Sequence, residues 1–173
     1  NIMPHVKVSD NLYYNHYAII PNTKSEFWTL VGEGIKRCLK NSKIKIDFIY
    51  PEDNNYQSQN KLIAELNNLK YKGAAISVIS PEMQSETLNK ALDANLHIVT
   101  IDSDAPNSNR RTFIGPSQYE SGYAAGKEIL KLNDQRKIVV FTGNSKSENS
   151  KDRISGINKA LSNVNLKIDC IQK

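Results

Sequence analysis

Cysteine and tryptophan are scarce in this chain of 173 residues, which contains two cysteines and one tryptophan. Cys38 and Cys170 are far apart and fit no metal-binding spacing, so the sequence predicts no metal site and no cofactor built on them. Cys38 follows Val31 and Gly34 at helical spacing, which predicts a buried core thiol. A disulfide between the two cysteines stays open as the alternative.

Motifs of nucleotide-binding and hydrolytic enzymes are also missing. Gly122 and Gly126 are separated by three residues rather than four, so this stretch is not a phosphate-binding P-loop. No GxGxxG pattern opens a helix after a strand, and no GxSxG elbow occurs. The three histidines, His5, His16 and His97, are isolated and complete no catalytic set. We therefore expect a protein without enzymatic activity.

Long apolar runs are absent as well. No segment approaches the about eighteen consecutive apolar residues of a membrane-spanning helix. The start of the chain lacks the charged, apolar and small-residue regions of a signal peptide. The first residue is Asn1 rather than methionine, which indicates a processed or trimmed product.

Charge of one sign is not concentrated in any segment. The net charge is +5, from 23 basic and 18 acidic residues, and the basic residues are scattered. The densest basic group, Lys36, Arg37 and Lys40, has the spacing of a solvent-facing helix side. A nucleic-acid interface usually needs a clustered patch with aromatic or helical readers. The sequence therefore predicts no nucleic-acid partner.

Short apolar runs do alternate with longer segments of helical periodicity from Tyr17 onward. Strands are predicted at 17–20, 44–50, 74–80, 97–101, 112–115, 137–142 and 166–171. The first helix is expected to start at a Ser25 cap and to bury the apolar face of Phe27, Leu30, Val31, Ile35, Cys38 and Leu39. The second helix is expected to end near Gly73. The later helices are expected to cover 83–92, 123–132 and about 149–161. This alternation predicts an α/β fold with a doubly wound, mainly parallel sheet.

The segment 98–126 carries the strongest functional signal. Its apolar strand ends at Ile101 and is followed by Asp102 and Asp104. Ligands of open α/β sheets bind beyond the carboxyl ends of the strands. A carboxylate there can accept paired hydrogen bonds from sugar hydroxyls, and an indole such as Trp28 can stack on a sugar ring. Asp102 is the expected ligand contact, whereas Asp104 is expected to shape the turn with Pro106.

A second polar loop, 143–153, leads from a strand into a helix. Asn149 or Ser150 is the predicted cap of that helix, and Lys151 in its first turn is a candidate ligand contact. Arg153 is expected to pair with Asp152 or Asp134. Arg110 and Arg111, beside the short strand at 112–115, are expected to be solvated or salt-bridged.

Four stretches of the chain resemble a known family. They are NTKSEFWTLVGEG (22–34), YPEDNNYQSQNKLIAEL (50–66), YKGAAISVISPE (71–82) and IVTIDSDAPNSNRRTFIGPSQYESGYAAG (98–126). Together they are similar to the type I periplasmic sugar-binding proteins of the ribose and rhamnose kind, which serve ABC importers. The resemblance implies two α/β lobes that close on a solute like a hinged clamp.

The resemblance also implies the ligand-binding residues. The aromatic pair of the first helix falls on Phe27 and Trp28, and the aspartate of the fourth strand falls on Asp102. Ser25 stands where the family has the asparagine before that pair, and Ser103 stands where ribose binders often have arginine. Lys151 falls near the arginine of the second lobe, which keeps the charge but loses the bidentate geometry.

The resemblance further divides the chain into an N-terminal arm (1–16), a first lobe (17–133) and the beginning of a second lobe (134–173). The chain is then either a part of a longer protein or completed by a partner. The expected partners are a sugar and a membrane ABC permease, and the expected location is periplasmic or extracytoplasmic, with or without a membrane anchor.

Three other functions are compatible with the fold. The same module can serve as the ligand-sensing domain of a histidine kinase or chemoreceptor. A repressor effector domain would need a DNA-binding helix-turn-helix before Tyr17, where no such pattern occurs. An α/β enzyme would need a catalytic set, which the sequence does not provide.

Overall fold

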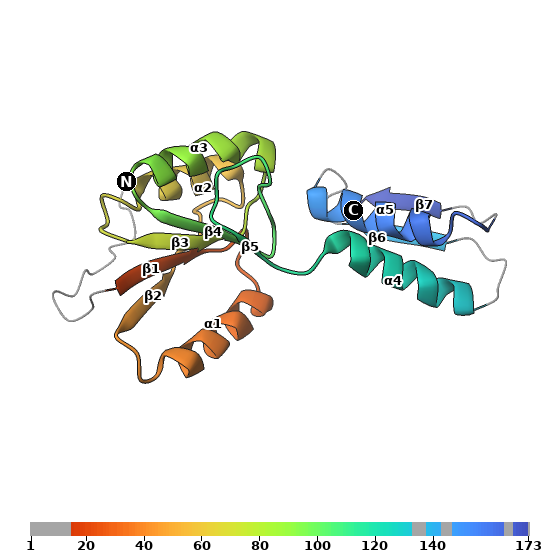
Figure 1. The fold of residues 1–173 in the computed structure, drawn as a ribbon, viewed down its shortest axis with the longest axis horizontal. Helices are drawn as coiled ribbons and strands as arrows, with labels where there is room; N and C mark the ends of the chain where they lie inside the picture. The colour runs from red at the N-terminus through yellow and green to blue at the C-terminus, as the bar shows by residue number, and fades with distance from the viewer. Residues whose placement is uncertain (1–14, 133–137, 143–146, 165–167, 173) are drawn as a thin grey trace.

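The computed structural model describes residues 15–132, 138–142, 147–164 and 168–172, the last of these by its backbone alone (Figure 1). Its elements run in the order β1 (Asn15–Ile20), α1 (Glu26–Leu39), β2 (Ile44–Phe48), α2 (Tyr56–Glu65), β3 (Gly73–Ile76), α3 (Pro81–Asp93), β4 (His97–Ile101), β5 (Phe113–Ile114), α4 (Gln118–Lys131), β6 (Ile138–Thr142), α5 (Glu148–Ala160) and β7 (Ile168–Gln172). None of the helices in this part of the chain has the length and apolarity to cross a membrane.

The strands form two parallel sheets. One has five strands in the order β2-β1-β3-β4-β5, and the other pairs β6 with β7. The predicted α/β class with a parallel sheet is therefore confirmed. β1 begins at Asn15, two residues before the predicted start of the first strand, while residues 1–14 of the predicted arm and the predicted boundary at 133–134 lie outside the described residues.

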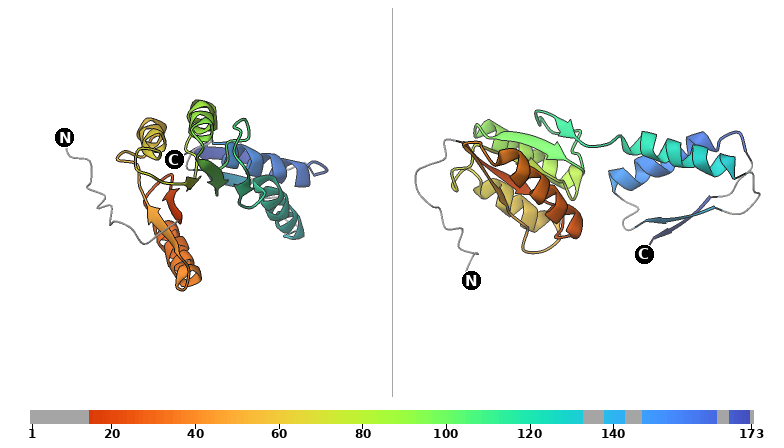
Figure 2. Two further views of the ribbon diagram at one scale, coloured as in Figure 1. Left: turned by 60° about the vertical axis from the view of Figure 1, so that its left-hand side comes forward. Right: turned by 90° about the horizontal axis from the view of Figure 1, so that it is seen from below.

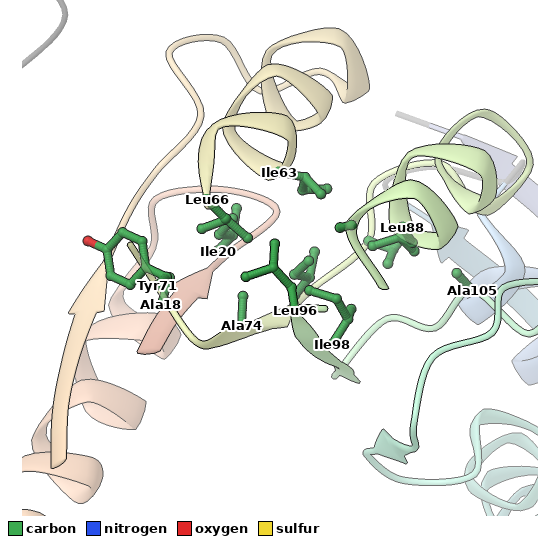
Figure 3. Close-up of a cluster of buried hydrophobic side chains, with 13 residues drawn as sticks. Ala18, Ile20, Ile63, Leu66, Tyr71, Ala74, Leu88, Leu96, Ile98 and Ala105 are labelled. Carbon is green, nitrogen blue, oxygen red and sulfur yellow. The ribbon is translucent and has the colours of Figure 1, made fainter. Parts of the chain in front are cut away.

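The helices cover both faces of the five-stranded sheet. From β1 the chain moves outward to β2 through α1, and it then returns past β1 to β3 through α2. Because parallel crossovers are right-handed, this reversal places α1 on one face and α2 with α3 on the other (Figures 1 and 2). The buried cluster lies between the sheet and α2 with α3, where Ile20, Ile63, Leu88 and Ile98 are fully buried (Figure 3).

Helix α1 is rotated relative to the prediction, so that three of its six predicted core residues, Val31, Ile35 and Leu39, are half-buried and the other three are exposed. Trp28 and Gly32 are its buried residues, whereas Phe27 is 53% and Leu30 is 59% exposed. Cys38 is also exposed, so the prediction of a buried thiol is wrong. Gly32 lets α1 approach the Phe48 ring of β2, and Cys38 lies about 100° around the helix from the side that faces the sheet. The side chain of Cys170 lies outside the described residues.

Two helix ends also differ from the predictions. Helix α2 ends at Glu65 rather than near Gly73, and Lys70 in the following turn has a left-handed backbone with φ 59°. Helix α5 is capped by Ser147, whose hydroxyl accepts a hydrogen bond from the Ser150 amide at 3.3 Å. The predicted caps Asn149 and Ser150 are therefore wrong, since the cap lies two and three residues before them and the helix already begins at Glu148.

A polar cluster centred on Asp47 joins β1, β2 and the turn before β3. The Tyr71 hydroxyl donates to Asp47 Oδ2 at 2.8 Å, His16 Nε2 lies 2.6 Å from the same oxygen, and Lys45 Nζ lies 3.5 Å away. Burial raises the pKa of Asp47, but the hydrogen bonds from Tyr71 and His16 and the Lys45 charge outweigh burial and hold this pKa below its ordinary value of 3.8. Burial and the neighbouring carboxylate raise the pKa of Tyr71.

Asp47→Asn should lower the free energy of unfolding by about 1–2 kcal/mol at pH 7, because it removes a charged acceptor from this cluster. A lowered folded-state pKa stabilises the protein above the unfolded pKa, and this contribution is lost as the pH falls through the folded pKa. The gap between parent and variant in urea unfolding should therefore close below pH 3.8. Glu52→Gln, at an exposed site, is the control. A gap that is independent of pH would contradict the assignment.

Candidate functional site

The carboxyl ends of β1, β3 and β4 lie at one edge of the five-stranded sheet. The order in which strands are added to the sheet reverses between β1 and β3. Loops at such a switch point diverge to opposite faces of the sheet and leave a crevice. Backbone hydrogen bonds tie the edge together, from Ser77 N to Ile20 O at 3.0 Å and from Val78 N to Ser103 O at 3.2 Å. Residues 21–22, 77–80 and 102–103 therefore form the candidate site.

Asp102 occupies a special backbone position at this edge. Its φ is 65°, in the left-handed region that aspartate tolerates better than most residues. Its amide donates to the Ile114 carbonyl at 3.0 Å, and the Ser77 hydroxyl donates to Asp102 Oδ2 at 3.2 Å. The carboxylate is partly exposed. It is thus held in place at the end of the sheet while it remains partly accessible to solvent.

The aromatic pair of α1 divides into a buried and an open ring. Trp28 is 2% exposed, and its indole N–H donates to Asn22 Oδ1 at 3.2 Å. Phe27 is 53% exposed and meets Trp28 edge-on, with ring centroids 5.1 Å apart and planes at 78°. Phe27 is therefore the accessible ring of the pair, and it packs against the buried Trp28.

The two candidate serines are placed differently. Ser25 is the N-cap residue of α1, as predicted, but its hydroxyl makes no capping hydrogen bond, and its carbonyl accepts the Thr29 amide at 3.3 Å. Ser103 follows Asp102 directly, and its amide donates to Ile101 O at 2.7 Å. Both are partly exposed.

Helix α5 reaches the same edge through Asn149. Its side-chain N–H donates to the Asp102 carbonyl at 3.4 Å. Lys151, two residues later, pairs with Glu148 at 2.6 Å, and this hydrogen bond is the main reason why the pKa of Lys151 is raised. The negative charge of Glu82, in the first turn of α3, raises this pKa further. Lys151 is thus engaged within its own helix by Glu148.

The remaining charged residues of the predicted site shape turns and helix contacts. Asp104 Oδ1 accepts the Ala105 amide at 2.7 Å, and Arg110 Nη2 donates to Asp104 Oδ2 at 2.6 Å. The predicted turn-shaping role of Asp104 and the salt-bridged role of Arg110 are therefore confirmed. Arg153 Nε donates to Gln118 Oε1 at 2.6 Å, so its predicted pairing with Asp152 is wrong, and Asp134 lies outside the described residues.

Several polar residues at the edge escaped the sequence analysis. Ser77 and Asn149 contact Asp102, and Gln59 and Gln84 are both fully buried beneath the loops that leave β1 and β3. One signal was available, because each glutamine precedes apolar residues at spacings of four and seven, Ile63 with Leu66 and Leu88 with Ala91. Each therefore stands on the buried side of its helix. Within the described ranges, no group of three or more His, Cys, Asp or Glu side chains could hold a metal ion.

Comparison with known proteins places this geometry in context. The family described as periplasmic binding protein domain matches residues 17–172. The chain is 30% identical over 88 residues to the D-allose-binding periplasmic protein of Escherichia coli, a match that covers 50% of this chain and 28% of that protein.

Two solved structures illustrate the fold similarity. One is an ABC transporter solute-binding protein of Burkholderia graminis in complex with D-arabinose, with a TM-score of 0.87, 25% identity, and coverage of 95% of this chain and 58% of that chain. The other is the XylFII-LytSN complex, with a TM-score of 0.83, 26% identity, and coverage of 91% and 59%. The chain thus spans less than two thirds of the length of each of these proteins.

Proposed function

The chain belongs to the periplasmic binding protein family, and from this we propose that it captures a sugar between two hinged α/β lobes for import by a membrane ABC permease. The similarity to a D-allose-binding protein and to a D-arabinose complex supports a sugar as the ligand. Both relatives are named as binding or transport proteins, which fits a protein without enzymatic activity. The proposed location is periplasmic or extracytoplasmic.

The observation that carries this proposal is the setting of Asp102. Its carboxylate lies at the carboxyl edge of the sheet, is held by the Ser77 hydroxyl, and is only partly buried. A fixed carboxylate can accept two hydrogen bonds from neighbouring sugar hydroxyls, and charge-assisted hydrogen bonds are the strong ones. Ser25 and Ser103 add hydroxyl groups that both donate and accept.

Phe27 completes the chemistry that a sugar requires. Its exposed ring can pack against the apolar C–H face of a pyranose or furanose, while Trp28 holds it edge-on. In this proposal Trp28 acts through Phe27 rather than by direct stacking, because its own ring is 2% exposed.

We assign the five-stranded sheet with α1, α2 and α3 to the first lobe, and β6, α5 and β7 to the beginning of the second. Helix α4 goes with the second lobe because it packs on α5 at backbone contact, although the predicted boundary at 133–134 would place it in the first. Lys151 and Asn149 would approach the ligand from the second lobe, at the start of α5. The Asn149 hydrogen bond to the Asp102 carbonyl supports this arrangement, since it joins the two lobes at the residue proposed to hold the sugar.

A ligand-sensing role is the second candidate, and the similarity to XylFII in its complex with LytSN favours it. Transport and sensing share the sugar site and differ in the partner. A gene neighbourhood with ABC permease subunits supports transport, whereas one with a sensor kinase and specific co-purification with that kinase supports sensing.

Sugar binding should change the emission of Trp28, the only tryptophan in the chain. A sugar that packs on Phe27 alters the edge contact between the two rings and the polarity around them. We expect a saturable change in the full-length protein with at least one of D-allose, D-arabinose, D-ribose, D-xylose, D-glucose and D-galactose. Phe27→Leu should raise the sugar concentration that gives half of the full change by about tenfold. Leu30→Ala, at an exposed site on the same helix, is the control. Equal affinities in parent and Phe27→Leu would exclude the stacking role.

A further inference from the structure

Two glutamines are completely buried next to the candidate site. Gln59 belongs to α2 and Gln84 to α3, and both side chains are 0% exposed. A buried amide is costly unless its polar atoms find partners, and it can make two hydrogen bonds as donor and two as acceptor. The hydrogen-bond partners of the two amides therefore identify the segments that the amides hold in place.

The Gln59 side chain makes all four of the hydrogen bonds that an amide can make. Its side-chain N–H groups donate to the Pro21 carbonyl at 3.2 Å and the Ser77 carbonyl at 2.9 Å. Its oxygen accepts from the Ile79 amide at 3.3 Å and from Gln84 Nε2 at 2.8 Å. One side chain thus connects the loop after β1 with the loop after β3, across the switch point of the sheet.

Gln84 fixes the orientation of Gln59. Its oxygen accepts from the Ile79 and Ser80 amides at 2.9 and 2.8 Å, which leaves its N–H groups as donors. These donate to Gln59 Oε1 and to Asn60 Oδ1 at 3.2 Å. Because Gln59 Oε1 must face Gln84, the N–H groups of Gln59 must face the carbonyls of Pro21 and Ser77. The pair has one satisfied arrangement, and reversing either amide would oppose two donors or two acceptors.

The chain of contacts continues to Asp102. Ser77 is 0% exposed, its carbonyl is held by Gln59, and its hydroxyl donates to Asp102 Oδ2. We propose that Gln59 is a positioning residue for the ligand-binding carboxylate, acting through Ser77 on Asp102, and that Gln84 sets the orientation that this requires. The inference rests on the proposed sugar-binding function and adds residues that would never touch the sugar.

The chain offers a matched control for such a role. Gln118, the first residue of α4, is also buried, at 5% exposure, and accepts a hydrogen bond from Arg153 at 2.6 Å. Its contact joins α4 to α5 and, among the described residues, involves neither Ser77 nor the loop after β1. Gln118→Met and Gln59→Met therefore remove the same amide at similar burial, and only the latter disturbs the proposed route.

The experiment measures both stability and sugar affinity in the full-length protein. Calorimetric titration with the tightest-binding sugar of the six-sugar panel gives affinity, and urea unfolding without sugar gives stability. Both methionine variants should lose stability, but only Gln59→Met should lower the affinity for the sugar, by about tenfold. In a Ser77→Ala background, which by itself weakens binding, Gln59→Met should add less than about twofold, because the route through Ser77 is already cut.

Ser77→Ala changes one hydroxyl and provides an independent test if Gln59→Met fails to fold. Unchanged affinity in Ser77→Ala, unchanged affinity in folded Gln59→Met, or an equal loss in Gln118→Met would each overturn the positioning role. A tenfold additional loss from Gln59→Met in the Ser77→Ala background would also overturn it. A parent protein that binds no sugar would overturn the proposed function and the inference with it, which separates that failure from the others.

Discussion

Asp102→Asn is expected to weaken sugar binding by about 100-fold or more. Two hydrogen bonds from sugar hydroxyls to a carboxylate contribute about 3 kcal/mol together, and an amide replaces one of the two acceptor oxygens by a donor. Asparagine has the same shape and tolerates the left-handed backbone found here at φ 65°, so the fold should be preserved. Calorimetric titration of parent and variant, with circular dichroism as the check of folding, measures the effect.

Asp104→Asn is the matched comparison, because Asp104 lies two residues further on in the same turn. Its carboxylate pairs with Arg110 and accepts the Ala105 amide, so this substitution should lower stability more than affinity. The two variants are thus expected to differ: Asp102→Asn should mainly lower sugar affinity, and Asp104→Asn should mainly lower stability through the turn. Comparable loss of affinity in both variants, or retained affinity in Asp102→Asn, would show that the carboxylate of Asp102 is not the ligand contact.

Gly156→Val is expected to have the largest effect on stability of any single change considered. Helices α4 and α5 cross at backbone contact, since a Cβ atom at Gly156 would overlap the carbonyl oxygen of Tyr119, and one at Gly122 would overlap that of Arg153. Neither backbone can move aside without separating the helices. We expect a loss of more than about 4 kcal/mol, seen as lost cooperative unfolding and poor soluble yield.

Gly34→Ala is the control for Gly156→Val, because it also replaces a glycine inside a helix. A Cβ at Gly34 meets nothing within 4 Å. Alanine is favoured over glycine in a helix by about 1 kcal/mol, so this variant should be as stable as the parent or slightly more stable. If Gly156→Val unfolds at the same urea concentration as the parent, the close crossing of α4 and α5 is wrong.

The fold class was predictable because apolar strands and periodic helices alternate along the whole chain. The ends of β1 and β4 match the predictions for the same reason, and the position of Asp102 follows from the end of β4. By contrast, β2 and β3 end two and four residues earlier than predicted. The orientation of α1 was not predictable, because its apolar residues cover a wide arc and the burial of Trp28 over Gly32 depends on the Phe48 ring of a neighbouring strand.

The polar support of the site was hidden for a different reason. Gln59 and Gln84 each interrupt an apolar helix face at one position, and a single polar residue near a helix start is ordinarily solvated. Only the tertiary fold brings the two amides within 2.8 Å of each other. The cap of α5 was misplaced because Ser147, Asn149 and Ser150 are all good capping residues, and the helix start selects among them.

A crystal structure of the full-length protein with the tightest-binding sugar of the panel tests the central claim most directly. We predict that sugar hydroxyls lie within hydrogen-bond distance of both carboxylate oxygens of Asp102, that the sugar ring packs on Phe27, and that Ser77 still donates to Asp102. A sugar bound away from the carboxyl edge of the five-stranded sheet, or at that edge without contact to Asp102, would contradict the account.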